Sequence, residues 1–405
     1  MKRHSGNNIF KSFIFLIFTG TLFSCTTLKN TSDSEPLFND GTPVITAETE
    51  FKNRDTLLLT FAGDLMAHRP NWINKDFAEP LEALKNLAQE ADFAFINLET
   101  PVADSKEWST YPYFNVHGSY AEAAVDAGFN VFSLSNNHTN DQGLDGIKET
   151  KKFFDSLEEK HSDSVRNVYS SGLKSSPADE MSYAVLEKNG WKILYLAVTE
   201  LLNQNTYTGY INFVKPDKKS REEFYKKIKK LKEETECDFF ILSLHTSDEE
   251  YVLTTPESQR NHYQNLLENG ADIIAANHPH VAKEWYLYVN EDCTAKKLLF
   301  MSQGNTLSAQ RNDPDFKKPS NIRDYTGDGF VTQVRLEKTE EGIKIVKINP
   351  VLITLYITKQ RRYVVKILND VFIEELKKEG RKDWSTYLLE RKKLMEKIKG
   401  KIIWQ

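Results

Sequence analysis

Short apolar runs alternate with segments of helical periodicity from Leu57 onward, and this alternation constrains the fold more than any other feature. Buried strands are predicted at Thr56–Ala62, Phe93–Leu98, Asn130–Leu134, Phe239–Leu244, Ile273–Ala276 and Leu298–Ser302. Helices are predicted where apolar residues recur every three or four positions, at Pro80–Glu90, Tyr120–Ala127, Ile147–Leu157, Arg221–Glu234 and Gln259–Leu267. Strands and helices that alternate in this way form βαβ units, so the chain is predicted to be an α/β protein.

Two regions depart from this rhythm toward antiparallel pairing. The Asn189-Gly190 turn predicts a hairpin between two apolar runs, Tyr183–Leu186 and Ile193–Val198. After Gly329 the predicted elements are a hairpin, a further strand and a basic amphipathic helical stretch, at Val331–Leu336, Ile343–Ile348, Leu352–Thr358 and Phe372–Ile402. We therefore expect one folded domain over residues 55–350 and a C-terminal extension over 351–405 that is mostly helical.

Composition excludes several classes of protein. The 405 residues include 40% hydrophobic and 27% charged residues, which is typical of a globular protein and excludes collagen, coiled coil and global disorder. The net charge is −5, with acidic and basic residues mixed along the chain, so electrostatic binding of nucleic acid is not expected. The three cysteines cannot form a disulfide framework or a zinc ribbon.

The N-terminal segment is predicted to direct export. Two basic residues, Lys2 and Arg3, precede a short apolar run over Ile9–Phe23, as in a secretory signal peptide. The sequence Leu22-Phe23-Ser24-Cys25 resembles a bacterial lipobox, so Cys25 is expected to be acylated after removal of residues 1–24. The alternatives are an ordinary signal peptide cut near Ser24, or an uncleaved anchor. Residues 25–54, which are polar and have no periodicity, would then tether the domain to the outer face of a bacterial membrane.

Polar side chains follow the predicted strands at the point where each strand ends. The segments after six strands contain Asp64, Asn97 and Glu99, Asn136 to Asp141, His245, Asn277 to His280, and Gly304-Asn305. Because the carboxyl ends of parallel strands meet at one edge of a sheet, these side chains are expected to lie together. Carboxylate, amide and imidazole groups bind Mn, Zn or Fe ions.

Each of these residues alone has a simpler explanation. An Asp after a strand often caps a helix, and a buried His often only forms hydrogen bonds. The recurrence of such residues at six strand ends favours a metal site over six separate structural roles.

These motifs resemble the CapA family of bacterial capsule and poly-γ-glutamate synthesis proteins, within the calcineurin-like metallophosphoesterase superfamily. The resemblance covers about residues 56–350 and is carried by the segments 63–69, Asn97-Leu98-Glu99, 136–143, 278–281 and Gly304-Asn305. It implies a four-layer α/β/β/α sandwich, here followed by a C-terminal strand and helix extension. It also implies two divalent metal ions at one sheet edge.

The sequence departs from the family pattern in one loop and from the wider superfamily in two motifs. Family members carry H-W-G-x-E-Y where this chain has one more residue and no glycine, over His245 to Tyr251. The superfamily histidine two residues after the first Asp is Met66 here, and a G-D-x-x-D motif is replaced by Asn97-Leu98-Glu99. CapA-like proteins share these last two changes, which leave the site one ligand short of the superfamily pattern.

The resemblance also implies roles for individual residues. Asp64 and His280 would hold one ion, and Asn137, His245 and His278 would hold the other. Glu99 is the expected bridging carboxylate.

The remaining predicted roles concern catalysis and substrate. His138 would protonate the leaving group. Asp141 would orient the imidazole of His138, unless Asp141 instead caps the helix that starts near Gly143. Arg69 would bind a phosphate or carboxylate, with a surface ion pair as the alternative. Asn97 and Asn305 are predicted to contact substrate.

Other residues are predicted to surround the substrate. The loops Trp108–His117 and Asn203–Phe213 suit the walls of a pocket. His68, which replaces the usual glycine of the family motif, is a further candidate contact.

Two functions remain open at this point. The first is a surface-tethered hydrolase that acts on a phosphorylated or polymer-linked envelope substrate and is associated with capsule or poly-γ-glutamate synthesis. The second is a non-catalytic subunit that binds or exports such a polymer. Capsule-synthesis membrane proteins are candidate partners for either function.

Overall fold

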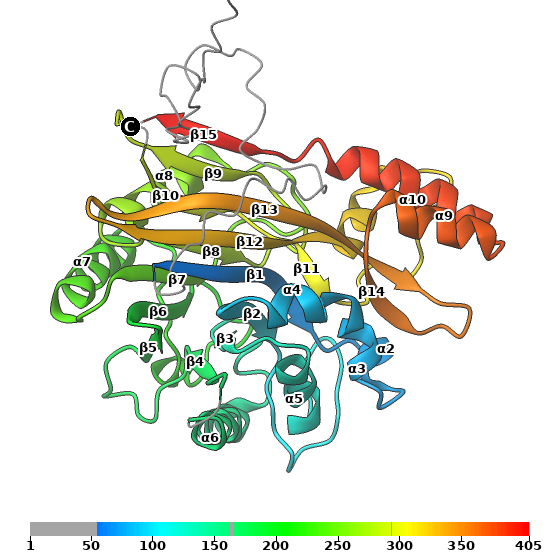
Figure 1. The fold of residues 1–405 in the computed structure, drawn as a ribbon. Coiled ribbons are helices and arrows are strands. Elements are labelled where there is room, and N and C mark those ends of the chain that lie inside the picture. Colours follow the sequence, from blue (N-terminus) through cyan, green and yellow to red (C-terminus); the bar gives the residue numbers. More distant parts are fainter. Residues whose placement is uncertain (1–54, 163–164, 293, 405) are drawn as a thin grey trace, which may run out of the picture. The chain divides into compact units, whose positions relative to one another are not determined.

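The computed structural model describes residues 55–404 apart from 163, 164 and 293. Its strands are β1 (Thr56–Met66), β2 (Phe93–Glu99), β3 (Val131–Ser133), β4 (Tyr169–Ser171), β5 (Tyr183–Lys188), β6 (Trp191–Thr199), β7 (Phe239–His245), β8 (Ile273–Asn277), β9 (Trp285–Val289), β10 (Ala295–Phe300), β11 (Asn305–Leu307), β12 (Asp328–Thr339), β13 (Gly342–Ile357), β14 (Tyr363–Ile367) and β15 (Gly400–Trp404). Its longer helices are α5 (Gly118–Asp126), α6 (Gly143–Lys160), α7 (Lys218–Glu234), α8 (Glu257–Glu268), α9 (Asp370–Lys378) and α10 (Lys382–Met395) (Figure 1).

The strands form two mixed sheets. The first has the order β14-β13-β12-β1-β2-β3-β4, with β11 paired beside β1, and the second has the order β15-β9-β10-β8-β7-β6-β5. In the first sheet β1, β2, β3 and β4 are parallel, and in the second β6, β7, β8 and β10 are parallel. The antiparallel strands lie at the outer parts of both sheets, where the sequence departs from the βαβ rhythm.

Three hydrophobic cores divide the fold into four layers. The central core joins the two sheets face to face, with Leu59 and Phe95 from one sheet and Ile193 and Ile241 from the other. A second core joins the first sheet to α5, α6, α9 and α10, and a third joins the second sheet to α7 and α8. The predicted α/β/β/α sandwich is therefore confirmed, since every sheet face is covered by another apolar layer.

Most of the predicted elements are present, with two local differences. The hairpin at Asn189-Gly190 is confirmed, and both turn residues have the positive φ that this turn requires. The predicted helix Pro80–Glu90 is instead three short pieces, α3 (Ala78–Leu81), the 3₁₀ turn η1 (Glu82–Leu84) and α4 (Lys85–Gln89). Its leucines recur every three residues, which suits a 3₁₀ turn better than a continuous α-helix.

The C-terminal extension is not a separate helical unit, which corrects the predicted boundary at residue 350. That boundary falls inside β13, which pairs with β12 from Gly342 to Thr354. Pro350 is tolerated there because β14 pairs only from Ile353 onward, so Pro350 needs no N–H on that side. Beyond β13, the extension adds β14 to the first sheet and β15 to the second. Helices α9 and α10 come between these two strands along the chain. The predicted helical stretch Phe372–Ile402 thus contains two helices and the start of a strand.

Several predictions concern residues outside the described range. The signal peptide, the lipidation site Cys25 and the tether all lie in residues 1–54, so they stay predictions. Cys237 is a partly buried free thiol, and Cys293 lies outside the described residues. Among the helices that the structure describes, none is both long and apolar enough to cross a membrane.

Candidate metal centre

The predicted site residues meet where the parallel strands of both sheets end. Asp64 lies near the end of β1, Asn97 and Glu99 end β2, and the segment 135–141 follows β3. From the second sheet, His245 ends β7 and His278 follows β8. Because the two sheets stack face to face, these ends form one buried polar cluster.

Asp64 is held in place by an amide and faces an imidazole. Its Oδ1 accepts a hydrogen bond of 2.8 Å from Asn97 Nδ2, and its Oδ2 lies 3.2 Å from His280 Nδ1. Asn305 Oδ1 lies 3.0 Å from the same nitrogen of His280. Asn305 is itself fixed by its pairing with Asp64 in the parallel β1–β11 ladder. The structure thus brings together the two residues predicted to hold the first ion.

Glu99 lies between the two predicted groups of ligands. Its Oε1 is 3.6 Å from His280 Nε2 and 4.0 Å from His245 Nε2. Its side chain is fully buried. A carboxylate that faces one histidine from each group is in the position expected for a bridge.

The second predicted group is also assembled. His245 Nε2 lies 2.8 Å from Asn137 Oδ1, and Asn97 Nδ2 lies 3.4 Å from His245 Nδ1. The rings of His245 and His278 meet edge to face, with centroids 5.0 Å apart. The ligand atoms of Asp64, Glu99 and His245 lie within 4.8 Å of one another.

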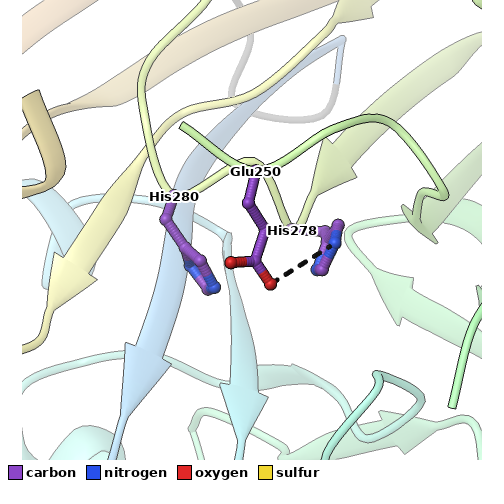
Figure 2. A group of neighbouring side chains, drawn as sticks. All are labelled: Glu250, His278 and His280. Carbon is purple, nitrogen blue, oxygen red and sulfur yellow. Dashed lines mark ion pairs between the residues drawn. The ribbon is translucent and has the colours of Figure 1, made fainter. Parts of the chain in front are cut away.

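Glu250 joins the cluster although it was not among the predicted ligands. Figure 2 shows its carboxylate between the rings of His278 and His280, and Glu250 Oε1 lies 3.8 Å from His278 Nε2. One ligand atom from each of these three residues lies within 4.8 Å of the others. Both histidines have positive φ, 101° for His278 and 57° for His280. Such strained backbone is retained where the surrounding structure needs a side chain in one direction.

Burial shifts the pKa values of three of the candidate ligands toward their neutral forms. Burial, and then the nearby carboxylates of Asp64 and Glu250, raise the pKa of Glu99 well above its usual value. Burial, and then the neighbouring histidines, lower the pKa values of His245 and His278 well below the usual value. For His280 burial lowers the pKa, but the hydrogen bond and charge of Asp64 outweigh it and raise the pKa overall.

Unpaired atoms in the cluster fit a bound cation. Glu99 Oε1 and His278 Nδ1 are buried and have no hydrogen-bond partner among the described residues. A buried polar atom without a partner costs about 1–3 kcal/mol. A divalent cation would satisfy carboxylate and neutral imidazole groups together, so the donor set suits Mn, Zn or Fe ions.

The predicted acid pair is also formed. His138 Nδ1 lies 2.6 Å from Asp141 Oδ2, and both side chains are almost fully buried. Asp141 Oδ2 also accepts a hydrogen bond of 2.8 Å from the backbone N–H of Phe114. Burial raises the pKa of Asp141, and the hydrogen bond and charge of His138 oppose this.

Asp141 does not cap the following helix. Helix α6 begins at Gly143 with Gln142 at its N-cap and no side-chain cap. The structure therefore favours the orienting position of Asp141 over the capping alternative.

The other predicted residues take different positions. Asn97 is buried beneath Asp64 and His245, and Asn305 supports His280, so both brace predicted ligands; their contacts with substrate stay predictions. Arg69 is exposed at the start of α2 (Arg69–Trp72) and has no ion pair with any described residue; its contact with a phosphate or carboxylate stays a prediction.

His68 lies close to the acid pair. It packs against Phe114 with ring centroids 5.2 Å apart, and Phe114 in turn packs against His138 at 4.6 Å. His68 and Phe114 therefore connect the surface to His138.

Two site residues were missed by sequence reasoning. Glu250 corresponds to the acidic residue of the family's H-W-G-x-E-Y motif, so the motif itself could have indicated it. Asn203 starts a predicted pocket loop, and its Nδ2 lies 3.2 Å from His138 Nδ1 and 3.4 Å from His138 Nε2. Nothing in the local sequence distinguishes Asn203 from the other polar residues of that loop.

Hydrogen bonds to a buried carboxylate and one buried ion pair fix the loop that carries Glu250. Glu200 accepts hydrogen bonds from the backbone N–H and the hydroxyl of Ser247, both at 3.1 Å. Lys283 Nζ donates to Asp248 Oδ2 at 2.7 Å, with both side chains buried. The loop is therefore held at Ser247 and Asp248, three and two positions before Glu250.

Comparison with known proteins places these features in a family. Residues 58–310 match the family model described as bacterial capsule synthesis protein PGA_cap. The capsule biosynthesis protein CapA of Bacillus anthracis is 27% identical over 279 residues, which cover 64% of this chain and 61% of that protein. The PGA biosynthesis protein CapA of Bacillus subtilis strain 168 is 24% identical over 259 residues, which cover 62% of this chain and 63% of that protein. The chain thus spans about three-fifths of the length of these curated relatives.

Solved structures give more distant likenesses. A hypothetical protein from Thermus thermophilus has a TM-score of 0.40 and 16% identity, covering 73% of this chain and 98% of that one. The calcineurin-like phosphoesterase YfkN from Bacillus subtilis has a TM-score of 0.38 and 12% identity, covering 82% of this chain and 99% of that one.

Proposed function

Since the chain belongs to the PGA_cap family of bacterial capsule synthesis proteins, as its motifs predicted, we propose that it is a metal-dependent hydrolase of the cell envelope. Its two CapA relatives are named for capsule and PGA biosynthesis. The proposed substrate is a phosphorylated or polymer-linked envelope compound connected with capsule or poly-γ-glutamate synthesis.

The observation that carries this proposal is the buried convergence of carboxylates and histidines beside an acid pair. Asp64, Glu99, His245, His278 and His280 are all buried and in contact within one cluster. A cluster of this kind would be costly to bury without cations. We assign Glu250 to the same centre as an additional ligand.

The proposed roles follow from the contacts of each residue. Asp64 and His280 would hold one ion, and Asn137, His245 and His278 the other. Glu99 and Glu250 would each face a histidine of both groups. Two divalent ions in such a site supply Lewis-acid stabilisation of the charge that develops on attacking and leaving oxygens.

His138 is the proposed general acid. With its Nδ1 proton directed at Asp141, Nε2 is the nitrogen that would hold and release a proton to the leaving group. The carboxylate of Asp141 would fix the orientation of the ring and stabilise its protonated form. Asn203 would hold the same ring from the other loop.

We further propose that the protein works at the outer face of a bacterial membrane, attached through a lipid on Cys25. Capsule-synthesis membrane proteins would be its neighbours there. Mass spectrometry of the purified full chain tests the anchor directly, since acylation should be found on Cys25 and lost in Cys25→Ser.

Hydrolysis of bis-(p-nitrophenyl) phosphate by the full chain with Mn²⁺ or Zn²⁺ tests the enzymatic proposal. Loss of general acid catalysis in His138→Ala should lower turnover about 10²- to 10⁴-fold. His161→Ala is a matched control, because His161 lies at the C-terminal end of α6 and should leave turnover unchanged. Absence of turnover with either metal would favour the non-catalytic, polymer-binding function instead.

A further inference from the structure

A cavity of about 430 Å³ lies next to the candidate metal centre and has no role in the description above. Its walls include His68, Thr110, Asn312, Asp313, Arg361 and Tyr363. This volume is within the range of about 300–1,000 Å³ that small-molecule sites occupy. His68 links the cavity to the centre, because its ring packs on Phe114, which packs on His138.

Much of the cavity wall comes from residues beyond the family match, which ends at residue 310. Arg361 and Tyr363 belong to the turn and strand that follow β13. The adjacent Arg362 forms ion pairs with Asp76 and Glu79, which ties this turn to the segment around α3. The extension is thus fixed against the domain at the point where it closes the cavity.

Arg361 itself is left available. It is exposed, and it forms no ion pair with any described residue, in contrast to Arg362. Its φ is +61°, in the left-handed region that a non-glycine residue seldom adopts, and the backbone hydrogen bond from its N–H to Thr358 O holds that conformation. A strained residue fixed by its turn is typical of binding sites.

The other polar groups of the wall can also donate hydrogen bonds. The backbone N–H of Ala309 donates to His68 Nδ1 at 3.3 Å, so a neutral His68 ring carries its proton on Nε2. Burial, and then the charges of His280 and His138, lower the pKa of His68 to about 3, which keeps the ring neutral at ordinary pH. Thr110 Oγ1 accepts from the backbone N–H of Arg69 at 3.1 Å, which leaves the hydroxyl proton of Thr110 free to donate.

We propose that this cavity is a substrate subsite that binds an anionic group, a carboxylate or a phosphate ester, through Arg361, His68 and Thr110. The inference rests on the proposed function, because the anionic group would belong to the substrate cleaved at the metal centre. Arg361 supplies the charge and the other two supply neutral donors. Asp313 lies in the same wall and opposes the anion, so the subsite favours a single anionic group over a highly charged one.

Calorimetric titration of the full chain with benzoate and with phenyl phosphate tests the proposal and separates the two anions. Titrations are made with Mn²⁺ and after treatment with EDTA, so that binding at the metal centre is distinguished from binding in the cavity. Loss of a charged hydrogen bond of about 1.5–3 kcal/mol predicts that Arg361→Gln raises the Kd of the bound probe at least about tenfold. Asp313→Asn should lower that Kd, because it removes a repelling charge.

Lys359→Met is the matched control, since Lys359 is a cation in the same turn but does not line the cavity. It should change the Kd less than twofold. A response to Arg361→Gln with only one probe identifies the anion as a carboxylate or a phosphate ester. Equal Kd values in Arg361→Gln and the parent, or an equal loss in Lys359→Met, would overturn the subsite.

These titrations involve no turnover, so they separate the two proposals. An inactive protein whose probe binding depends on Arg361 would refute the hydrolase and keep the subsite. An active protein whose probe binding does not depend on Arg361 would keep the hydrolase and refute the subsite.

Discussion

Replacement of Asp328 by Asn tests how the C-terminal extension is joined to the two sheets. Asp328 starts β12 and is fully buried. Its Oδ1 accepts from Arg311 Nη1 at 2.8 Å and from Thr354 Oγ1 at 2.6 Å, and its Oδ2 accepts from Arg391 Nε at 2.6 Å. Both arginine side chains are also almost completely buried. One carboxylate therefore pairs with two buried cations, one of them on α10.

The expected loss follows from these contacts. Charged hydrogen bonds contribute about 1.5–3 kcal/mol each, and removal of one partner of a buried ion pair costs about 3–5 kcal/mol because a charge is left uncompensated. Asp328→Asn keeps the shape of the side chain and removes its charge, so we expect the free energy of unfolding to fall by about 3–5 kcal/mol. Urea denaturation of parent and variant at pH 7 measures this difference.

Glu284→Gln provides the control. Glu284 pairs with Lys401 of β15 at 2.7 Å, but these side chains are 38% and 52% exposed. Solvent screening limits such a pair to about 1 kcal/mol or less. A loss in Asp328→Asn no larger than the loss in Glu284→Gln would refute the account of the buried cluster.

The pH dependence of this effect has a definite sign. Burial raises the pKa of Asp328, but the charges of Arg311 and Arg391 outweigh it and lower the pKa below its usual value. A depressed folded-state pKa stabilises the protein above the unfolded-state value of about 3.9, and this contribution is lost as pH falls through the folded-state pKa. The difference between parent and Asp328→Asn should therefore stay constant from pH 8 to pH 5 and shrink only in stronger acid.

Three further predictions concern the centre and its supports. Asp141→Asn should lower turnover of bis-(p-nitrophenyl) phosphate about 10- to 100-fold without changing metal content, because it affects only the orientation of the acid; a parallel loss of metal would contradict this role. Lys283→Met should lower the free energy of unfolding, measured by urea denaturation, by about 3–5 kcal/mol, because it leaves Asp248 buried without its cation. The double variant Lys283→Met with Asp248→Leu should recover most of that loss, because no uncompensated charge is left. Gly63→Ala should give a poorly folded chain in circular dichroism, because its Cβ would lie 1.8 Å from the backbone oxygen of Gly304; a native spectrum and denaturation midpoint would contradict it.

The convergence of the candidate ligands could be predicted from the sequence because its signals are local. The predicted ligands stand at or shortly after the ends of apolar strands, and the parallel order of those strands brings their ends together whatever the loop lengths. Asp64, Glu99 and His245 lie in the last residues of β1, β2 and β7. The motif resemblance then predicted their pairing, which contacts such as that between Asp64 and His280 reproduce.

The features that sequence reasoning missed depend on long-range packing. Glu250 stands five residues after its strand, in a loop that differs from the family motif. That loop is fixed by a hydrogen bond from Ser247 to the distant Glu200 and by the buried ion pair between Asp248 and Lys283. The C-terminal extension was predicted to be mostly helical because its basic amphipathic pattern fits a helix. The pairing of β15 with β9, which lies more than a hundred residues earlier in the chain, has no signal in the local sequence.

Metal content per chain is the measurement that tests the central claim most directly. Elemental analysis of the full chain, purified and equilibrated with Mn²⁺ or Zn²⁺, should give close to two ions, and Glu99→Gln should reduce this number because Glu99 faces both groups of ligands. No bound ion in the parent protein, or an unchanged content in Glu99→Gln, would contradict a dinuclear centre bridged by Glu99.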